Sequence, residues 1–387
     1  MLWLAKGHQF DDLVIDQFNY QIENIYIYGC GEIGKLVYDC ISVVDIDITF
    51  IDKNTIKDFC GCNVILLEQL DISKLNTSII VVAASEVNAE VMLRKLIFKG
   101  YFEGKNCFKY DRFLNFYWPL LSVYKFNKLV SPYFHAITLV IGESCTLKCT
   151  NCNANIPYIS NKYNPSFDDV KRESKLLFQS IDYIHQLRLS GGEPLLNKNF
   201  KDIISFLYSE YGTFFHNIEF TMNGTIIPDE DTLNIISKYD VKVSISDYSA
   251  SVPRLKDNYN LIERKFQEKK ISYTRLTDIE WIDFGFNSGK YDNDDISVLR
   301  RYDDCWHPCK DVRNGRLSSC SQALYASKRF NLLSGDINLQ TEKDKRVILE
   351  YLMGFFPEKG FPEACRYCYG HTNINKNVIN VAGQIRE

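Results

Sequence analysis

The sequence of 387 residues has no long apolar run and little excess of charge of either sign. A membrane-spanning helix needs about 18 consecutive apolar residues, and no stretch approaches that length. The first twelve residues, MLWLAKGHQFDD, turn acidic too early for a secretory signal peptide. The net charge of −4 leaves no basic footprint for nucleic acid. We therefore expect a cytoplasmic protein with neither a membrane nor a nucleic-acid partner.

Tandem repeats and low-complexity tracts are missing as well. A hydrophobic content of 45% and a charged content of 24% are typical of a globular protein. A chain of this length holds about two or three domains, each with its own core.

Cysteine, in contrast, is frequent, with thirteen residues. A reducing cytosol keeps thiols free, so clustered cysteines there indicate metal ligands or catalytic groups rather than disulfides. Five are spread over the first third of the chain, and the other eight form two groups, within 145–152 and 305–368.

The first part of the chain, residues 1–130, alternates strands with helices, which is typical of βαβ units on a parallel sheet. The expected strands are 24–29, 46–52 and 78–84, and the expected helices are 32–44 and 86–100.

The second part, residues 131–304, contains at least five further βα repeats. These predict an α/β fold with a partial (β/α)6 TIM-like barrel, in which functional residues lie at the C-terminal ends of the strands. The first cysteine group, the stretch 191–194 and the loops after Met222 and Ser246 all fall at such ends.

The third part, residues 305–387, is loop-rich and holds five cysteines. Asn314-Gly315 predicts a two-residue hairpin turn of type I′. We expect a small cysteine-rich extension, in which Gly315 returns the chain so that Cys320 faces Cys305.

The stretch CTLKCTNC places Cys145, Cys149 and Cys152 in one loop. A structural zinc site takes four nitrogen or sulfur ligands, and a closed iron–sulfur cubane takes four thiolates. Three cysteines are one ligand short of either site. A zinc site with a distant fourth ligand and three unrelated buried cysteines remain alternatives.

The spacing Cys-x3-Cys-x2-Cys resembles that of the radical S-adenosylmethionine (radical SAM) superfamily, and the resemblance covers about residues 131–305. It implies that Cys145, Cys149 and Cys152 hold three irons of a 4Fe–4S cluster, while S-adenosylmethionine binds the fourth. The reduced cluster then cleaves this cofactor to methionine and a 5′-deoxyadenosyl radical, and the protein orients that radical.

The same resemblance implies cofactor-binding residues on successive strands. Gly191-Gly192-Glu193-Pro194 matches the motif that binds the methionine amino group, because glycines allow backbone to approach a ligand and Glu193 provides an acceptor. Asn223 belongs to the loop after the third strand, and the residues expected at the ribose are Ser244, Ser246 and Asp247. Where many members carry an aromatic residue before the third cysteine, this chain has Asn151.

The second cysteine group resembles the twitch half of a SPASM/twitch extension through Cys305, Cys320, Cys365 and Cys368. The resemblance implies a closed auxiliary 4Fe–4S cluster, which suits an electron acceptor and therefore alcohol oxidation. Cys309 is left over, or exchanges with Cys305. A zinc knuckle with four cysteine ligands remains the alternative.

The motif Gly29-x-Gly31-x-x-Gly34 follows a strand and opens a helix, and Asp52 ends the next strand. This is the arrangement of a dinucleotide-binding fingerprint, in which the free amides of the helix suit a pyrophosphate. NAD, a nucleotide-sugar and no ligand at all remain open for this Rossmann-like domain.

We therefore expect a radical SAM oxidoreductase of carbohydrate biosynthesis that works anaerobically on a sugar-like or nucleotide-linked small molecule. A reductase such as flavodoxin or ferredoxin would be its second partner. The candidates for a general base are Tyr248, Asp283 and His307. A peptide-modifying radical SAM maturase and a non-catalytic iron–sulfur or zinc scaffold remain alternatives.

Overall fold

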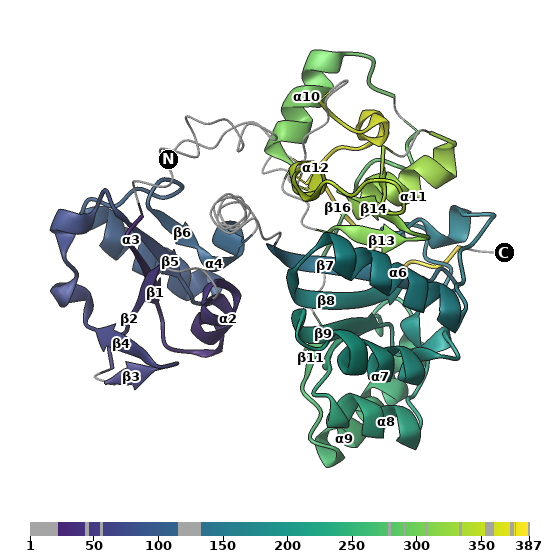
Figure 1. The fold of residues 1–387 in the computed structure, drawn as a ribbon, viewed down its shortest axis with the longest axis horizontal. Helices are drawn as coiled ribbons and strands as arrows, with labels where there is room; N and C mark the ends of the chain where they lie inside the picture. Colours follow the sequence, from purple (N-terminus) through teal and green to yellow (C-terminus); the bar gives the residue numbers. More distant parts are fainter. Residues whose placement is uncertain are drawn as a thin grey trace. The chain divides into compact units, whose positions relative to one another are not determined.

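The computed structural model consists of two compact units, residues 1–135 and 136–387 (Figure 1). The residues that it describes are 22–42, 46–54, 57–114, 133–277, 280–289, 291–305, 309–332, 335–352, 360–371, 375 and 377–385. No helix in these ranges is long and apolar enough to cross a membrane. The extension from residue 305 belongs to the second unit, because its strands continue the sheet of that unit.

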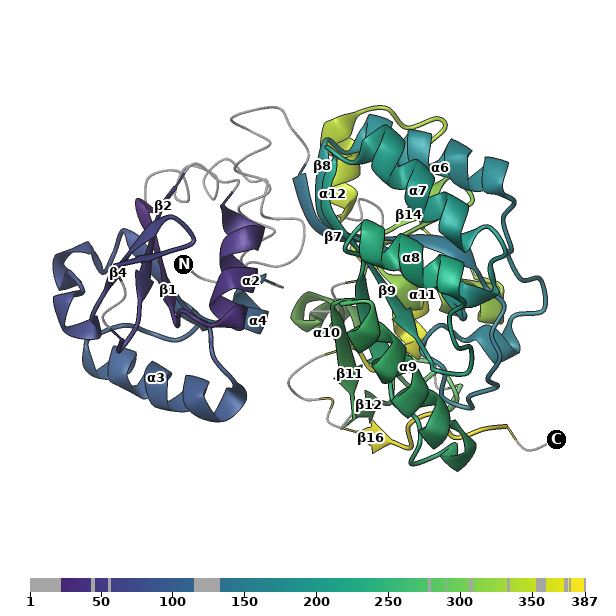
Figure 2. The same ribbon diagram turned by 90° about the horizontal axis from the view of Figure 1, so that it is seen from below.

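The N-terminal unit is built on a six-stranded sheet with the order β3-β4-β2-β1-β5-β6. Neighbouring strands run parallel except for the short pair β3 and β4. The order reverses between β1 and β5, so right-handed crossovers place helices α2 and α3 on opposite faces (Figure 2). The elements are β1 (Asn24–Tyr28), α2 (Glu32–Ile41), β2 (Asp47–Ile51), β3 (Asp58–Phe59), β4 (Cys62–Ile65), β5 (Ser78–Val82), α3 (Glu86–Phe98), β6 (Cys107–Lys109) and α4 (Tyr110–Arg112).

Strands β1 and β5 form the centre of this sheet, and every residue of both is buried. Continuous apolar strands are what a parallel sheet covered on both faces requires. The three strands and two helices that the sequence predicts are present. The sequence does not predict β4 and β6, because they have only four and three residues and no clear periodicity.

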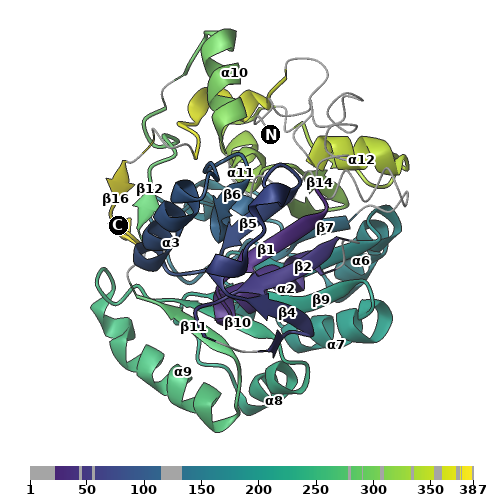
Figure 3. The same ribbon diagram turned by 90° about the vertical axis from the view of Figure 1, so that its left-hand side faces the viewer.

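The second unit contains an eight-stranded sheet with the order β11-β10-β9-β8-β7-β13-β14-β15. Helices α6 to α9 lie along the outer side of its parallel part (Figure 3). The elements of this part are β7 (Tyr133–Gly142), α6 (Phe167–Ser180), β8 (Tyr183–Gly191), α7 (Phe200–Tyr211), β9 (Phe215–Met222), α8 (Glu230–Lys238), β10 (Lys242–Ser246), α9 (Lys256–Glu268) and β11 (Tyr273–Leu276).

Alternation along the strands separates the two faces of this sheet. Leu187 and Leu189 of β8 are fully buried, whereas Arg188 between them is only partly buried. The register sets Arg188 beside Glu219 of β9. The outer face therefore forms the core with the helices, and the inner face carries polar side chains.

The parallel part has five βα strands instead of the expected six. The sixth parallel neighbour is β13 (Asp311–Arg313), which pairs with β7 at the opposite edge of the run. Among the described residues that follow β11, the chain forms only the short β12 (Trp281–Ile282) and helix α10 (Asp295–Asp304) before Cys305. Ile282, Phe284 and Phe286 alternate with other residues there, but the strand ends at Ile282 and pairs with β16 instead of β11.

The extension contains more regular structure than a loop-rich sequence suggests. Strands β14 (Arg316–Ser318) and β15 (Ile337–Asn338) continue the sheet, with helix α11 (Ser321–Phe330) between them in the chain. Helix α12 (Lys345–Leu352) follows β15, and β16 (Val378–Ile379) pairs with β12. Asn314 and Gly315 have φ angles of 49° and 67°, which confirms the predicted type I′ turn between β13 and β14.

Candidate functional site

The ends of β7 and β8 hold the first cysteine loop in place. Gly192 N donates to Gly142 O (2.8 Å), and Glu193 N donates to Ser144 O (2.8 Å). A Cβ atom at Gly191 would collide with the Gly142 carbonyl oxygen, and one at Gly192 with that of Ser144. Both glycines are therefore needed for close packing of backbone against the loop, in addition to the ligand role expected for them.

The thiols of Cys145, Cys149 and Cys152 lie together at the end of β7, packed with Leu147 and Ile156 in adjoining apolar clusters. Burial raises the pKa of all three thiols, that of Cys149 to about 11. Hydrogen bonds to each sulfur oppose this effect. They stabilise the thiolate, which is the form that ligates iron.

The donors to these sulfurs come from several segments of the chain. Asn223 Nδ2 donates to Cys145 Sγ (3.6 Å), and Gln384 Nε2 donates to Cys149 Sγ (3.3 Å). Backbone amides also lower the pKa of two thiols, those of Thr146 and Leu147 at Cys145 and those of Ala154, Asn155 and Ile156 at Cys152.

Glu193 is 3% exposed and precedes a short helix that starts at the buried Pro194. Its carboxylate accepts from the backbone amides of Asn223 (2.8 Å) and Leu195 (3.2 Å). Burial raises the pKa of Glu193 to about 7, although both amides favour the charged form. Its charge also raises the pKa of the Cys145 thiol, so the carboxylate lies near the cysteine loop. A buried carboxylate in this position favours a cationic ligand group such as an ammonium.

A cavity of about 600 Å³ opens beside Glu193, lined by the end of β7 and by the residues that precede α6 and α7. Its polar lining includes Ser144, Asn164 and Asn197. The volume lies within the range of about 300–1,000 Å³ that small-molecule sites occupy.

Asn223, at the end of β9, connects several loops of the site. Its Nδ2 donates to Thr146 Oγ1 (3.2 Å), and its Oδ1 accepts from Thr225 N (3.0 Å). The hydroxyl of Tyr259 contacts the carbonyl oxygens of Asn223 (2.9 Å) and Ser246 (3.1 Å). Tyr259 thus ties the ends of β9 and β10 together from helix α9.

Two polar residues expected at the ribose have partners within the protein. Ser244 Oγ donates to Glu219 Oε1 (2.7 Å) on the inner face of the sheet. Asp247 accepts from Arg275 Nη2 (2.7 Å) and from Ser249 N (2.7 Å). Burial alone would raise the pKa of Asp247, but these hydrogen bonds outweigh it and lower the pKa.

Three of the four cysteines expected at a second cluster, Cys305, Cys320 and Cys365, lie around Tyr302 of α10. The charges of Cys305, Cys320 and Cys365 act on the Tyr302 hydroxyl, and those of Cys305 and Cys320 act on the Cys368 thiol. Backbone amides donate to two of the sulfurs, from residue 371 to Cys305 Sγ (3.3 Å) and from residue 370 to Cys368 Sγ (3.3 Å).

Cys309 is partly buried, and its backbone oxygen accepts from the amide of Ser321 (3.2 Å), the residue directly after Cys320. The charges that act on its thiol include those of Arg188, Asp311 and Lys310. Cys305 lies near Cys320 and Cys368, and Cys309 lies beside the same helix start, so the exchange of Cys305 with Cys309 remains open.

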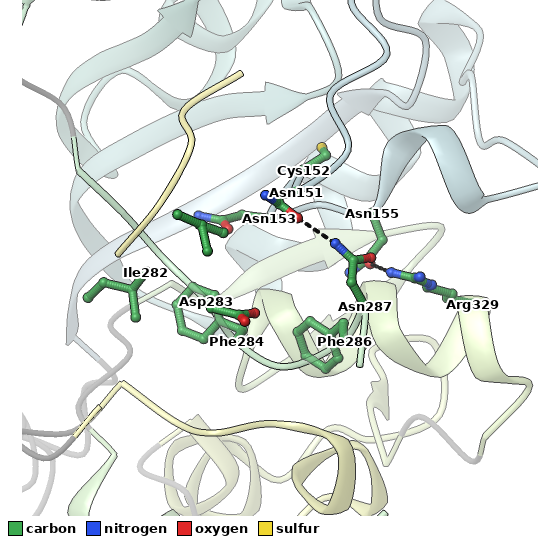
Figure 4. A pocket seen from close by; sticks show the side chains of 11 residues that line it. Asn151, Cys152, Asn153, Asn155, Ile282, Asp283, Phe284, Phe286, Asn287 and Arg329 are labelled. Carbon is green, nitrogen blue, oxygen red and sulfur yellow. Dashed lines mark hydrogen bonds between the residues drawn. The ribbon is translucent and has the colours of Figure 1, made fainter. Parts of the chain in front are cut away.

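The asparagine-rich turn around Cys152 contacts both the segment after β12 and the extension. Asn287 Nδ2 donates to Asn151 Oδ1 (2.6 Å), and Arg329 Nη1 donates to Asn155 Oδ1 (2.8 Å) (Figure 4). Both pairs line a small pocket next to Cys152. In place of an aromatic contact, Asn151 therefore links the cysteine loop to the segment that follows β12.

The three candidates for a general base differ in their surroundings. Burial raises the pKa of Tyr248, whose ring packs edge-on against Trp281 (5.7 Å between centroids), so its hydroxyl stays protonated at neutral pH. Asp283 accepts from Gly285 N (2.7 Å) and lines the pocket of Figure 4. His307 lies outside the described residues.

A further carboxylate, Asp311, lies on the inner face of the sheet and is 3% exposed. It begins β13 beside Thr138 of β7. Burial raises its pKa to about 7, while the Thr138 hydroxyl and the charge of Arg188 lower it. Arg188 also pairs with Glu219 (Nε to Oε2, 3.7 Å). A polar cluster therefore lies on the inner face of the sheet and consists of Asp311, Arg188 and Glu219.

The glycines of the N-terminal fingerprint also pack against backbone. A Cβ atom at Gly29 would collide with a carbonyl oxygen at the end of β5, and one at Gly34 with the carbonyl oxygen of Gly29. Gly31 has open space around it and precedes α2 without a side-chain cap. Asp52 accepts from Cys30 N (2.9 Å), so its carboxylate orders the loop itself.

Residues 139–275 match the family model described as the Radical SAM superfamily. This segment is therefore similar to radical SAM domains. It begins within β7 and ends within β11, so it includes the three-cysteine loop and the ends of the neighbouring strands.

Solved structures of radical SAM enzymes resemble parts of the chain. BtrN in complex with AdoMet and 2-DOIA has 14% identity and a TM-score of 0.42, over 64% of this chain and 98% of BtrN. SuiB of Streptococcus suis bound to S-adenosylmethionine has 16% identity and a TM-score of 0.32, over 50% of this chain and 45% of SuiB. The enzyme anSMEcpe with AdoMet and the Cp18Cys peptide has 16% identity and a TM-score of 0.32, over 52% of this chain and 59% of anSMEcpe.

A radical SAM domain implies S-adenosylmethionine and a 4Fe–4S cluster, and the donor set of the cysteine loop fits that cluster. Cys145 and Cys149 accept side-chain N–H donors, and backbone amides lower the pKa of Cys152, as an anionic thiolate in a buried site requires. Within the described ranges, no three His, Cys, Asp or Glu side chains lie close enough to hold a single metal ion. Each cysteine of a cubane ligates a different iron, so its sulfurs stand apart from one another.

Several residues around the radical SAM domain carry no signal in the sequence. Glu143, directly after β7, is fully buried between Arg313 (2.9 Å) and Lys328 (2.6 Å) of the extension. Gln384 reaches the cysteine loop from a remote position. Only the strand-end position of Glu143 could have marked it beforehand.

Proposed function

We propose that the chain is a radical SAM oxidoreductase that oxidises an alcohol of a carbohydrate-like or nucleotide-linked small molecule. One observation carries this proposal: three thiols with N–H donors lie beside the buried Glu193 at the strand ends of a radical SAM domain. The thiols would ligate the cluster, and Glu193 would accept from the cofactor's ammonium group.

The parts of the chain divide this function between them. Residues 131–304 would hold the cluster and S-adenosylmethionine, and residues 305–387 would hold an auxiliary 4Fe–4S cluster as a twitch-type extension. Residues 1–130, with the sheet order that reverses beside the Gly29 loop, would bind a nucleotide or nucleotide-sugar as a Rossmann-like domain. A reductase such as flavodoxin or ferredoxin would supply electrons.

When bound, these groups supply a 5′-deoxyadenosyl radical that abstracts a hydrogen atom and, at the second site, an acceptor for the electron that the substrate then loses. The chain's own task is to bind the alcohol and to take its proton. Asp311 suits that task because its carboxylate lies on the inner face and has a pKa of about 7. Arg188 and Glu219 beside it provide donors and acceptors for further hydroxyl groups.

The first test asks whether the cluster and the cofactor chemistry exist. Anaerobic reconstitution should give about eight irons per chain, as two cubanes require, and the reduced protein should release 5′-deoxyadenosine from S-adenosylmethionine. Cys145→Ala should abolish that release. Four irons with one zinc would remove the second cluster, and persistent release from the variant would contradict the assignment of the loop.

The second test asks for the substrate class. Labelled nucleotide-sugars and aminocyclitols should transfer deuterium from a carbinol carbon into 5′-deoxyadenosine. In Cys320→Ala, cofactor cleavage should continue while the ketone product disappears, because the electron acceptor is lost. Deuterium transfer from a peptide instead of these alcohols would show a peptide-modifying enzyme.

A further inference from the structure

The segment 377–385, here called the strap, runs from β12 back to the first cysteine loop. It starts beside β12, where Asp283 N donates to Asn377 O (2.8 Å) and Val378 and Ile379 form β16. It then runs antiparallel to the cysteine loop, with a bridge between Cys149 and Gln384. The backbone bonds on either side are Thr150 N to Gly383 O (2.7 Å) and Ile385 N to Lys148 O (2.8 Å).

Both polar atoms of the Gln384 side chain form hydrogen bonds at this contact. Its Oε1 accepts from Lys148 N (2.9 Å), and its Nε2 donates to Ala382 O (2.7 Å) and to Cys149 Sγ (3.3 Å). The orientation of the amide follows from these partners, because a backbone N–H can only donate and a backbone carbonyl can only accept. One N–H of Gln384 is therefore directed at the sulfur of Cys149.

The surroundings of this hydrogen bond are apolar. Ala382 is fully buried against Leu147 and Cys149, which are 4% and 7% exposed. Ala382 also has a positive φ of 51°, a left-handed conformation that is strained for alanine. The strained Ala382 thus lies where the strap aligns with the cysteine loop. A hydrogen bond in these buried, apolar surroundings is stronger than one in water.

We propose that the strap sets the reduction potential of the cluster held by Cys145, Cys149 and Cys152, through the hydrogen bond from Gln384 to the Cys149 sulfur. This rests on the proposed function. A reduced cluster carries one more electron than an oxidised one, so an N–H directed at a ligand sulfur stabilises the reduced state more and raises the potential. Gln384 is then a positioning residue, which acts on the cofactor through Cys149.

The test is an anaerobic potentiometric titration of the reconstituted full chain, followed by electron paramagnetic resonance. Gln384→Met removes the donor at similar length, and we expect the potential of the S-adenosylmethionine-responsive cluster to become more negative. Gln384→Glu, which adds a negative charge beside the sulfur, should lower it further. Gln340→Met, at an exposed glutamine of the same unit, should leave it unchanged.

The second cluster serves as an internal reference. A shift confined to the cofactor-responsive cluster supports the proposal, whereas unchanged potentials in both Gln384 variants, or equal shifts of both clusters, overturn it. If Gln384→Met fails to hold the cluster, the wild-type protein labelled with ¹⁵N-glutamine decides, because Nε2 should then show a hyperfine coupling to the cluster. Absence of that coupling overturns the proposal alone, and absence of any cofactor-responsive cluster overturns the proposed function as well.

Discussion

Asp311 shows how a single residue acquires its property from its position. Thr138 and the charges of Arg188, Lys310 and Arg313 lower its pKa, and Tyr325 of α11 is influenced by its charge. Burial outweighs these contacts and raises the pKa from 3.8 to about 7. Because the folded-state pKa is the higher one, the stabilising contribution of the protonated form is complete below the unfolded value and is lost as the pH rises through about 7.

We therefore predict that the stability of the cluster-free protein falls with rising pH through this group. The expected loss is about 1.4 kcal/mol for each pH unit between the two pKa values. Asp311→Asn should remove this part of the pH dependence, while Asp283→Asn should retain it. Urea unfolding between pH 5 and pH 8 measures both, and parallel pH profiles of wild type and Asp311→Asn would refute the buried titration.

At the scale of secondary-structure elements, Glu143 joins the barrel to the extension. Its carboxylate is fully buried and pairs with Arg313 of β13 and Lys328 of α11. We predict that Glu143→Gln destabilises the second unit by about 3–5 kcal/mol, because a fully buried carboxylate that pairs with two partly buried cations is lost. Denaturant unfolding of the same protein preparation measures the loss.

The matched control is Glu230→Gln, which also removes a carboxylate between two lysines. Glu230 pairs with Lys265 (2.9 Å) and Lys269 (3.1 Å), but its side chain is 62% exposed. An exposed pair contributes about 0–1 kcal/mol, so this variant should unfold almost as the wild type does. Equal losses of stability in the two variants would contradict the role of Glu143 in joining the barrel to the extension.

The elements themselves differ in how far the sequence predicts them. The strands and helices between residues 133 and 276 follow local periodicity, and the cysteine motif follows local spacing, so both are visible in the sequence. The position of β13 beside β7 depends on a contact between residues far apart in the chain. Asp311, Glu143 and Gln384 owe their environments to such contacts, which no local pattern encodes.

At the scale of the whole molecule, the N-terminal unit has its own sheet and apolar core, and it contains none of the seven cysteines assigned to clusters. We predict that the chain unfolds in two calorimetric transitions. Removal of iron should lower the temperature of one transition only, because the cluster cysteines all belong to residues 136–387. A substitution inside the N-terminal core should lower only the temperature of the other transition.

Gly34→Ala provides that substitution, since a Cβ atom there would collide with the carbonyl oxygen of Gly29. Gly31→Ala is its control, because nothing lies within 4 Å of a Cβ atom at that position. Calorimetry of iron-loaded and iron-free protein should show that Gly34→Ala and iron removal act on different transitions, with additive effects. A single transition that responds to both changes would show instead that the two units fold as one cooperative body.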